Sequence, residues 1–357
     1  PEARAILDYD QLKLHCFEPG ALIRIDGRFH QFVDPWRRPR HFVRTALSPA
    51  ATVTEKLRIA GFRKHTTRVG LAELYDRPAQ TTIDLLRERG FSRAIIERFF
   101  RPFLGGVFLD RELQTSSRMC EFVFRMFSLG DAALPEHGMA QIPQQLASHL
   151  PAGVLRTATP VNAIEGHHVH LSTGERLTAR TVIVATEAPA ARRLLGDSEP
   201  ADGRTVICMY FAAQDPPVKD PILVLNGDGQ GPINNLCVPS QVSPVYAPQG
   251  KSLVSVTVLS RDTDQDALSS QVRSQLRSWF GPTSESWELL RTYEIAYALP
   301  VQTPPCLQPV AKPAELRRGL FICGDHCDTA SINGAMASGR RAAEAAAVYL
   351  RRSTDSA

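Results

Sequence analysis

Residues near the carboxyl-terminal end of the sequence combine types that together can bind an anion. The apolar run 320–323 ends at Gly324 and Asp325, and small residues follow at Ser331 and Gly334. A strand that turns through glycine into a helix presents unpaired backbone N–H groups, which together with the helix dipole favour a phosphate. The Asp325 carboxylate can accept a hydrogen bond from a sugar-like hydroxyl. The pattern predicts a site for a ligand that carries both groups.

The first turns of the helix that follows carry small side chains. Gly334, Ala335, Ser338 and Gly339 leave its surface bare, so that a flat ring or another backbone can approach closely. We expect this helix to continue to about Leu350. An alternative is a helix that needs its glycines only for packing. The order of apolar strand, carboxylate and small residues favours the binding site.

This pattern resembles the carboxyl-terminal flavin-binding motif of the FAD-dependent amine oxidase superfamily, which includes protoporphyrinogen oxidases and carotenoid desaturases. A second match, in the segments 138–147, 159–164 and 182–186, resembles the middle of the same flavin domain. The resemblance covers about 137–196 and 315–350 well. Residues 15–130 resemble the substrate domain of the desaturase and protoporphyrinogen-oxidase branch more loosely, mainly through 101–108.

The resemblance implies FAD as the cofactor and assigns roles to individual residues. It places the backbone of Val161 against the adenine, and Ala185 and Thr186 on the phosphate and ribose side. The complete set of implied cofactor-binding residues is Val161, Ala185, Thr186, Gly324, Asp325, Ser331, Ile332, Asn333, Gly334 and Ala335.

The superfamily opens with a strand, a Gly-x-Gly-x-x-Gly turn, a helix and an acidic residue, a unit of about 30 residues. The sequence contains no such fingerprint, because the glycines at 227–231 are followed by Pro232 and predict only a turn. We therefore expect that the chain lacks the N-terminal, pyrophosphate-binding part of the flavin domain.

The first 130 residues predict a hairpin followed by helices. The hairpin spans 18–35 and turns at Asp26-Gly27. Hydroxyl residues predict helix N-termini: Thr52 or Thr54 for a helix reaching Ile59, Thr82 for 83–89, Ser92 for 93–100 and Ser116 for a further helix. Pro102 and Gly105-Gly106 predict that 101–108 breaks the helical region.

The remaining chain alternates strands and helices. Residues 138–195 predict a helix at 142–150, short strands at 154–157, 160–164, 169–171 and 176–179, a buried parallel strand at 181–186, and a helix at 187–195. Residues 205–300 predict strands at 206–212, 222–225, 253–259 and 289–297, and a helix capped by Thr263 that runs to Phe280.

The predicted fold class is α/β with α+β character: an interleaved two-domain flavoprotein whose chain crosses between domains several times. We predict an incomplete, Rossmann-like FAD-binding domain at 137–200 and 315–353. The substrate-binding domain, with an antiparallel sheet and helices, is predicted at 15–136 and 201–314.

Composition excludes several classes of partner. The chain has 357 residues, 43% of them hydrophobic, and a net charge of +4, which does not indicate a nucleic-acid partner. No apolar run reaches the ~20 residues of a membrane helix. Seven scattered cysteines favour a reducing compartment over a disulfide framework, and we expect a cytoplasmic protein with a small, apolar substrate.

Other chemistries are weakly supported. Cys323, His326 and Cys327 lack the paired spacing of a structural zinc site, and no metal is predicted. His326 either faces the flavin ring or only packs, and the sequence does not decide between the two. Arg101 and Arg118 can meet an acidic substrate group, although structural ion pairs are commoner. No catalytic acid, base or nucleophile is assigned.

The predicted activity is removal of a hydride from a C–N or C–C bond of a largely apolar substrate, with FAD as the acceptor. Two alternatives stay open. The chain is a non-catalytic fragment or interaction module that cannot hold FAD, or it is a flavin-dependent isomerase.

Overall fold

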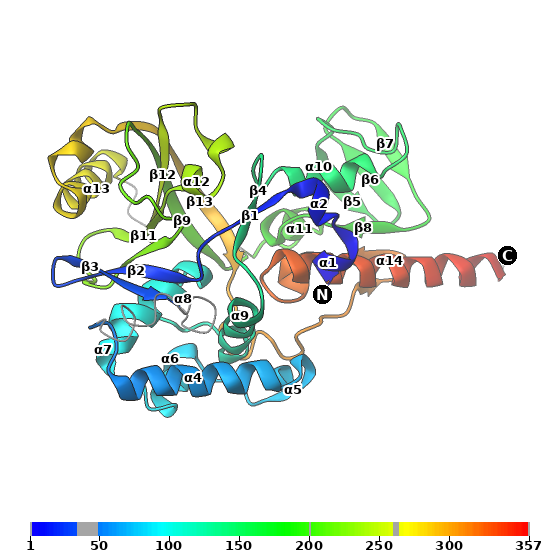
Figure 1. Ribbon diagram of the computed structural model, residues 1–357. Coiled ribbons are helices and arrows are strands. Elements are labelled where there is room, and N and C mark those ends of the chain that lie inside the picture. Colours follow the sequence, from blue (N-terminus) through cyan, green and yellow to red (C-terminus); the bar gives the residue numbers. More distant parts are fainter. Residues whose placement is uncertain (1, 34–48, 200, 260–263, 356–357) are drawn as a thin grey trace. The chain divides into compact units, whose positions relative to one another are not determined.

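The computed structural model describes residues 2–33, 49–199, 201–259 and 264–355 (Figure 1). The chain forms two compact units, each assembled from separated stretches. One unit contains Pro1–Tyr9, Ile142–Gly203 and Pro300–Ala357, and the other contains Asp10–Gln141 and Arg204–Leu299. The predicted fold class, mixed α/β in two interleaved parts, is confirmed.

A mixed sheet forms the centre of the unit made of 10–141 and 204–299. Among the described residues, its seven strands have the order β13 (Glu288–Pro300), β9 (Gly203–Ala213), β12 (Ser252–Val258), β11 (Ile233–Cys237), β10 (Leu223–Asn226), β2 (Gly20–Ile25) and β3 (Arg28–Val33). β10 and β2 run parallel, whereas β2–β3, β10–β11, β11–β12 and β12–β9 are antiparallel. The predicted β2–β3 hairpin turns at Asp26-Gly27 as expected, with positive φ at both residues.

Helix α13 (Gln265–Phe280) covers one face of this sheet. Its Leu268, Val272 and Leu276 pack with alternating residues of the strands, such as Phe211 and Val256, into the principal core. Asp264 caps the helix by accepting from the Ala267 N–H at 3.0 Å. The predicted cap, Thr263, lies outside the described residues.

Helices make up the rest of this unit, together with a short two-stranded ladder. They are α4 (Val53–Arg68), α5 (Leu71–Asp76), α6 (Thr82–Glu88), α7 (Arg93–Ile95), a π-helical turn (Ile96–Phe100), α8 (Arg101–Phe108), α9 (Ser117–Leu129) and α12 (Pro239–Val242), with 3-10 turns at Pro244–Tyr246 and Pro282–Ser286. The ladder pairs β1 (Leu14–Cys16) with β4 (Ala133–Pro135). Helix α2 (Tyr9–Leu12) spans the boundary of the units in the chain.

The predicted caps at Thr52, Ser92 and Ser116 are confirmed, and Thr52 forms a full capping box with Glu55. Two boundaries differ from prediction. α4 continues to Arg68, beyond the expected end at Ile59, and Thr81 rather than Thr82 caps α6.

The predicted helix break at 101–108 is wrong, because these residues form α8. Pro102 lies in the first turn of α8, where its missing N–H removes no intrahelical hydrogen bond. The glycines serve packing: a Cβ on Gly106 would lie only 2.8 Å from Asn235 Oδ1 and 3.0 Å from Asn234 Nδ2 of β11. The glycine therefore allows α8 to approach the sheet closely.

The unit made of 1–9, 142–203 and 300–357 contains two small sheets among its described residues. β14 (Glu315–Arg317), β15 (Leu320–Ile322) and β8 (Val182–Val184) form one, with β15 and β8 parallel. The other is an antiparallel meander of β5 (Val161–Glu165), β6 (His168–Leu171) and β7 (Arg176–Thr178). The helices are α1 (Glu2–Ile6), α10 (Gln141–Ser148), α11 (Ala188–Leu194) and α14 (Ile332–Asp355), which is red in Figure 1.

Three expectations for this unit are corrected. The strand predicted at 154–157 is wrong, because Val154 and Leu155 are 61% and 56% exposed and have no partner strand in the described structure. β8 is not fully buried, since it lies at the edge of its sheet with Ile183 exposed. On α10 the buried side chain is Gln145, which exchanges two 3.0 Å hydrogen bonds with the backbone of Asp8. Leu150, the last residue of the predicted helix 142–150, lies beyond the end of α10 and is exposed.

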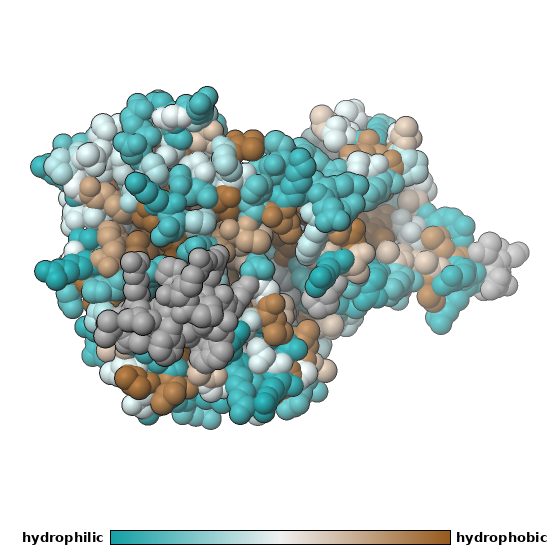
Figure 2. Space-filling view, in the orientation of Figure 1, coloured by the Kyte–Doolittle hydropathy of each residue, from teal (hydrophilic) through white to brown (hydrophobic). Residues whose placement is uncertain are grey.

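Hydrophilic residues predominate on the face of the molecule shown in Figure 2, with smaller hydrophobic groups among them. No helix within the described residues is both long and apolar enough to span a bilayer. The seven cysteines, all of which lie in the described ranges, are present as thiols.

Candidate functional site

Two parallel strands place the predicted site residues at one sheet edge. The Cys323 N–H donates to the carbonyl oxygen of Val184 at 2.9 Å, so β15 and β8 end together. Ala185 and Thr186 follow β8, and Gly324 and Asp325 follow β15. The carbonyl oxygen of Thr186 lies 3.5 Å from the position that a Cβ on Gly324 would take. The carboxyl ends of parallel strands are where open α/β sheets bind ligands.

Ser338 fixes the turn at Gly324 to helix α14. Its buried Oγ accepts from the Gly324 N–H at 3.0 Å and lies 2.8 Å from the Gly324 carbonyl oxygen. Gly324 has φ = +149°, and the imidazole of His326 packs against it. A Cβ at this position would lie 2.6 Å from His326 Cε1. The flat ring that approaches this glycine is thus a side chain of the protein itself.

Asp325 begins a 3-10 turn (Asp325–Cys327) between β15 and α14. Its side chain is 29% exposed, and Oδ1 lies 3.7 Å from His326 Nδ1, close enough for charge attraction but too long for a hydrogen bond. The carboxylate therefore remains open to a hydroxyl donor.

The next segment is attached to α14 by polar contacts. Asp328 forms a 2.6 Å ion pair with Arg341, and the Gln302 side chain bonds the backbone of both Asp328 and Ala330. These contacts fix the chain just before the helix.

The N-terminus of α14 holds five of the predicted residues. Ser331 Oγ accepts from the Gly334 N–H at 2.9 Å. Within the described part of the chain, the N–H groups of Ile332 and Asn333 have no acceptor. Ala335 closes the first helical turn by donating to the Ser331 carbonyl oxygen at 2.9 Å. A 24-residue helix with free N–H groups at its start favours an anion there.

Two residues of this group already serve the protein's own packing. A Cβ on Gly334 would lie 2.1 Å from the Thr329 carbonyl oxygen, so close backbone packing requires this glycine. Asn333 Oδ1 accepts from the N–H groups of Glu2 and Ala3, at 2.8 and 3.3 Å, and so attaches α1 to the start of α14.

Val161 lies in the meander rather than at the strand ends. It is half-buried on β5 and packs against the cluster of Ile164, Val184, Ala191, Leu194 and Leu320. Its side chain therefore supports the sheet, and any role in binding falls to its backbone.

Sequence reasoning missed the part played by Ser338, which was noted only as a small residue. Its signal was a hydroxyl at a position facing a strand on an alanine-rich helix. Arg101 pairs with Glu97 at 2.6 Å, and Arg118 bonds the Arg77 carbonyl oxygen, so both arginines have structural partners.

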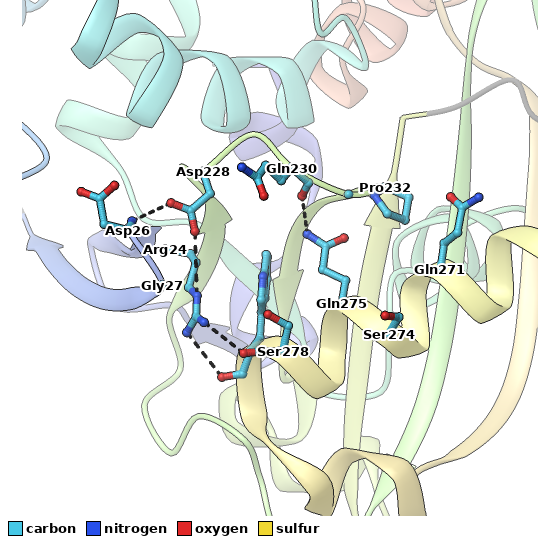
Figure 3. A pocket seen from close by; sticks show the side chains of 12 residues that line it. Arg24, Asp26, Gly27, Asp228, Gln230, Pro232, Gln271, Ser274, Gln275 and Ser278 are labelled. Carbon is cyan, nitrogen blue, oxygen red and sulfur yellow. Dashed lines mark hydrogen bonds and ion pairs between the residues drawn. The ribbon is translucent and has the colours of Figure 1, made fainter.

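A pocket of about 580 Å³ lies in the other unit, between the β2–β3 hairpin, the turn at 228–232 and α13 (Figure 3). The Arg24 guanidinium donates to the Ser278 carbonyl oxygen at 3.0 Å and pairs with Asp228 at 4.0 Å. Arg24 thereby stabilises the carboxyl end of α13. None of the predicted cofactor-binding residues lines this pocket.

Comparison with sequence models of known protein families identifies the family of this chain. The sequence model described as "Flavin containing amine oxidoreductase" matches residues 4–347.

The chain belongs to this family.

The predicted superfamily and the predicted cofactor, FAD, are confirmed for this flavin amine oxidoreductase. An FAD oxidoreductase is the general activity that the family supports.

Solved structures share the fold at low sequence identity. An oxidoreductase from Methanosarcina mazei superposes with a TM-score of 0.70 at 16% identity, covering 92% of this chain and 81% of the other. Wild-type putrescine oxidase bound to putrescine superposes with a TM-score of 0.67 at 14% identity, covering 97% of this chain and 85% of the other. Reduced UDP-galactopyranose mutase superposes with a TM-score of 0.58 at 14% identity, covering 94% of this chain and 79% of the other. A search of curated proteins finds no match.

The residues at the strand ends fit an FAD-type ligand. The open Asp325 carboxylate follows β15, and the free N–H groups of Ile332 and Asn333 start α14, a few residues farther along the same connection. A hydroxyl donor and an anionic acceptor together satisfy these groups, and a dinucleotide carries both.

Proposed function

We propose that this flavin amine oxidoreductase removes a hydride from a C–N or C–C bond of a largely apolar substrate and passes the electrons to oxygen or another acceptor. The observation that carries the proposal is the joint ending of β8 and β15 at a turn that Ser338 attaches to α14, a helix whose first N–H groups are free among the described residues. When bound, FAD supplies the ring that accepts the hydride.

The roles proposed for this chain's residues follow the family pattern. Asp325 would accept from a sugar hydroxyl, and Ile332 and Asn333 would donate their N–H groups to a phosphate. Ala185 and Thr186 would line the phosphate and ribose side, and the Val161 backbone would contact the adenine. Gly324, Ser331, Gly334 and Ala335 would shape the turn that these groups share.

We further propose that the unit made of 10–141 and 204–299 binds the substrate. Half-buried aromatic rings in this unit support the proposal that the substrate is apolar. Phe99 and Phe103 stack with centroids 5.4 Å apart, and Phe103 meets Phe127 at 5.1 Å. Phe127 is 38% exposed, whereas Phe100 is fully buried, so part of this aromatic group is core and part is available surface.

The reaction requires a substrate carbon that can lose a hydride. Bound FAD would supply the two-electron acceptor for that hydride, and a proton would leave the neighbouring nitrogen or carbon of the substrate as the double bond forms.

The first test is cofactor binding by the purified chain. We expect added FAD to remain bound through gel filtration and to give a yellow protein with flavin absorbance. A second measurement follows flavin bleaching under anaerobic conditions with primary amines and with apolar alkenes or polyenes. Bleaching by one class identifies the bond that is oxidised.

The alternatives give different results. A chain that stays colourless with excess FAD is the non-catalytic module, and the proposal is then wrong. A chain that binds FAD and converts a substrate without transferring electrons to any acceptor is an isomerase.

A further inference from the structure

The pocket between the β2–β3 hairpin, the turn at 228–232 and α13 takes no part in the proposed function. All the residues that line it belong to the unit made of 10–141 and 204–299. Its volume of about 580 Å³ is in the range of sites that bind small molecules. Apart from glycines, only Pro232 and Trp279 of the lining have apolar side chains, and Trp279 is buried. The pocket therefore offers a polar surface of ligand size.

Two buried amide side chains fix the turn that forms one wall of this pocket. Gln275 donates to the Gln230 carbonyl oxygen at 2.7 Å and accepts from the Ile233 N–H at 2.9 Å. Asn226 donates to the carbonyl oxygens of Gln230 and Ile233, at 2.8 and 2.6 Å. Gly231 has φ = +75°, and a Cβ there would collide with the Gln275 amide. The wall is thus held in place by the protein itself, and a ligand need not order it.

Most of the charge in the lining is used within the protein. The Arg24 guanidinium donates to the carbonyl oxygens of Ser278 and Trp279, at 3.0 and 3.5 Å, and lies 4.0 Å from Asp228 Oδ2. Asp228 Oδ1 accepts from the Asp26 N–H at 2.6 Å. Arg24 and Asp228 therefore balance each other, and the Asp26 carboxylate leaves one negative charge at this end of the pocket.

Four side chains of the lining keep polar groups that a ligand could use. Within the described residues, none of these groups has a hydrogen bond or an ion pair. They belong to Asp26, Gln271, Ser274 and Ser278. The last three are spaced by three and four residues along α13 and so share one helix face. Figure 3 shows this face turned toward the turn at 228–232, with Asp26 and Gln271 at opposite ends of the pocket.

These free groups distinguish between classes of ligand. An apolar ligand would leave all of them without partners, and an anion would meet the Asp26 carboxylate. A cation would satisfy that carboxylate but would offer no acceptor to the amide and the hydroxyls. A molecule with several hydroxyl groups can donate to the carboxylate and can both donate to and accept from the others.

We propose that this pocket binds a small polyhydroxylated molecule, either a sugar or a sugar alcohol. Asp26 accepts from hydroxyls at one end of the ligand, and Gln271 binds a hydroxyl at the other end. Ser274 and Ser278 contact the hydroxyls between them. The site lies in a different unit from the residues proposed for FAD, so this inference does not rest on the proposed function.

The test titrates the purified chain with D-glucose and with D-sorbitol, followed by saturation-transfer difference NMR. Methylammonium, inorganic phosphate and phenol are the cationic, anionic and apolar comparison probes. The lining variants are Gln271→Ala, Ser274→Ala and Asp26→Asn. Alanine is a good helix former, and asparagine tolerates the positive φ of Asp26, so these variants should fold. Ser270→Ala is the matched control, because this hydroxyl lies on α13 outside the lining and donates to the Asp266 carbonyl oxygen.

Loss of one neutral hydrogen bond weakens binding by about twofold to tenfold. We expect saturable binding of at least one of the two polyols, and Gln271→Ala and Ser274→Ala should each raise its dissociation constant by that amount. Asp26→Asn should weaken it by about tenfold, because a charge-assisted hydrogen bond is lost. Ser270→Ala should match the wild type. Preference for glucose or for sorbitol distinguishes a sugar site from a sugar-alcohol site.

Other results contradict the proposal. Absence of saturable binding of both polyols to the wild type would show that the pocket is not such a site. Polyol binding that survives all three lining substitutions would lie elsewhere on the molecule. Tighter binding of methylammonium than of either polyol, lost in Asp26→Asn, would make this a cation site. Each of these results would leave the proposed function intact, since FAD binding is measured separately.

Discussion

The hydroxyl of Ser338 contacts both polar backbone groups of Gly324, at 3.0 Å from its nitrogen and 2.8 Å from its oxygen. Fourteen residues separate the two in the chain. This side chain fixes the turn after β15 against the second turn of α14, and it is 2% exposed.

We predict that Ser338→Ala destabilises the protein by about 1–3 kcal/mol, because the Gly324 N–H loses its acceptor in a buried place. Thermal unfolding followed by circular dichroism measures the change. Ser353→Ala is the control, since that hydroxyl, farther along the same helix, donates among the described residues to the Tyr349 carbonyl oxygen within one helical turn. Equal losses in the two variants would contradict a special role for Ser338.

Asp325 gives a prediction about cofactor retention. Asp325→Ala removes the carboxylate proposed to accept from a sugar hydroxyl, and we expect FAD affinity to fall by about tenfold. Flavin content after gel filtration and a fluorescence titration with FAD measure the loss. Asp202→Asn alters an exposed carboxylate of the same unit and should retain FAD. Unchanged flavin content in Asp325→Ala would refute the role.

A pair of glycines tests the packing of α8 on the sheet. Gly106→Ala should destabilise the protein by about 1–3 kcal/mol, because the new Cβ meets Asn234 and Asn235. Gly61→Ala in α4 places its Cβ where no atom lies within 4 Å among the described residues, and should stabilise by about 0.5–1 kcal/mol. Urea denaturation measures both. The close approach of α8 to β11 would be in doubt if Gly106→Ala proved neutral.

His65 predicts a loss of stability in mild acid. Burial, followed by the positive charges of Arg89 and Arg77, lowers the pKa of His65. The unfolded chain therefore binds a proton near pH 6.5, before the folded protein does. The stability that depends on a neutral His65 is complete above that pH and declines as the pH falls toward the lower, folded-state value.

We expect His65→Gln to reduce this pH dependence between pH 7.5 and 5.5, as measured by urea denaturation at each pH. The exposed His149→Gln variant should keep the wild-type dependence. A steeper decline in His65→Gln than in the wild type would mean that the sign is wrong.

The sequence predicted those elements whose signals are local. Asp26-Gly27 requires a tight turn, and Thr52, Ser92 and Ser116 each cap the helix that follows. The β15 turn and α14 were predicted from an apolar run, glycine and small residues that all lie close together in the chain.

The errors arise where distant residues decide the structure. Pro102 suggested a break, but the first turn of a helix accepts proline, and the partners of Gly106 lie about 130 residues away in β11. The Ile233–Cys237 strand was not predicted, because two asparagines interrupt its apolar pattern. Val154 and Leu155 have the composition of a strand but no partner strand within the part of the chain that the structure describes.

The candidate site was predictable in composition but not in its internal contacts. Gly334 was expected to leave the helix surface bare for a flat ring, whereas Thr329 occupies the space beside it, and His326 packs over Gly324 in the turn. Nothing in the linear order of residues indicates that a histidine two positions later folds back over a glycine.

Asn333 links the N-terminal residues to the proposed phosphate site. Its side-chain oxygen accepts hydrogen bonds from the backbone N–H groups of Glu2 and Ala3, while its backbone N–H is one of the groups proposed to bind a phosphate. A ligand bound at the start of α14 should therefore stabilise α1. Slower hydrogen–deuterium exchange at residues 2–6 would then report binding of a ligand that carries no label.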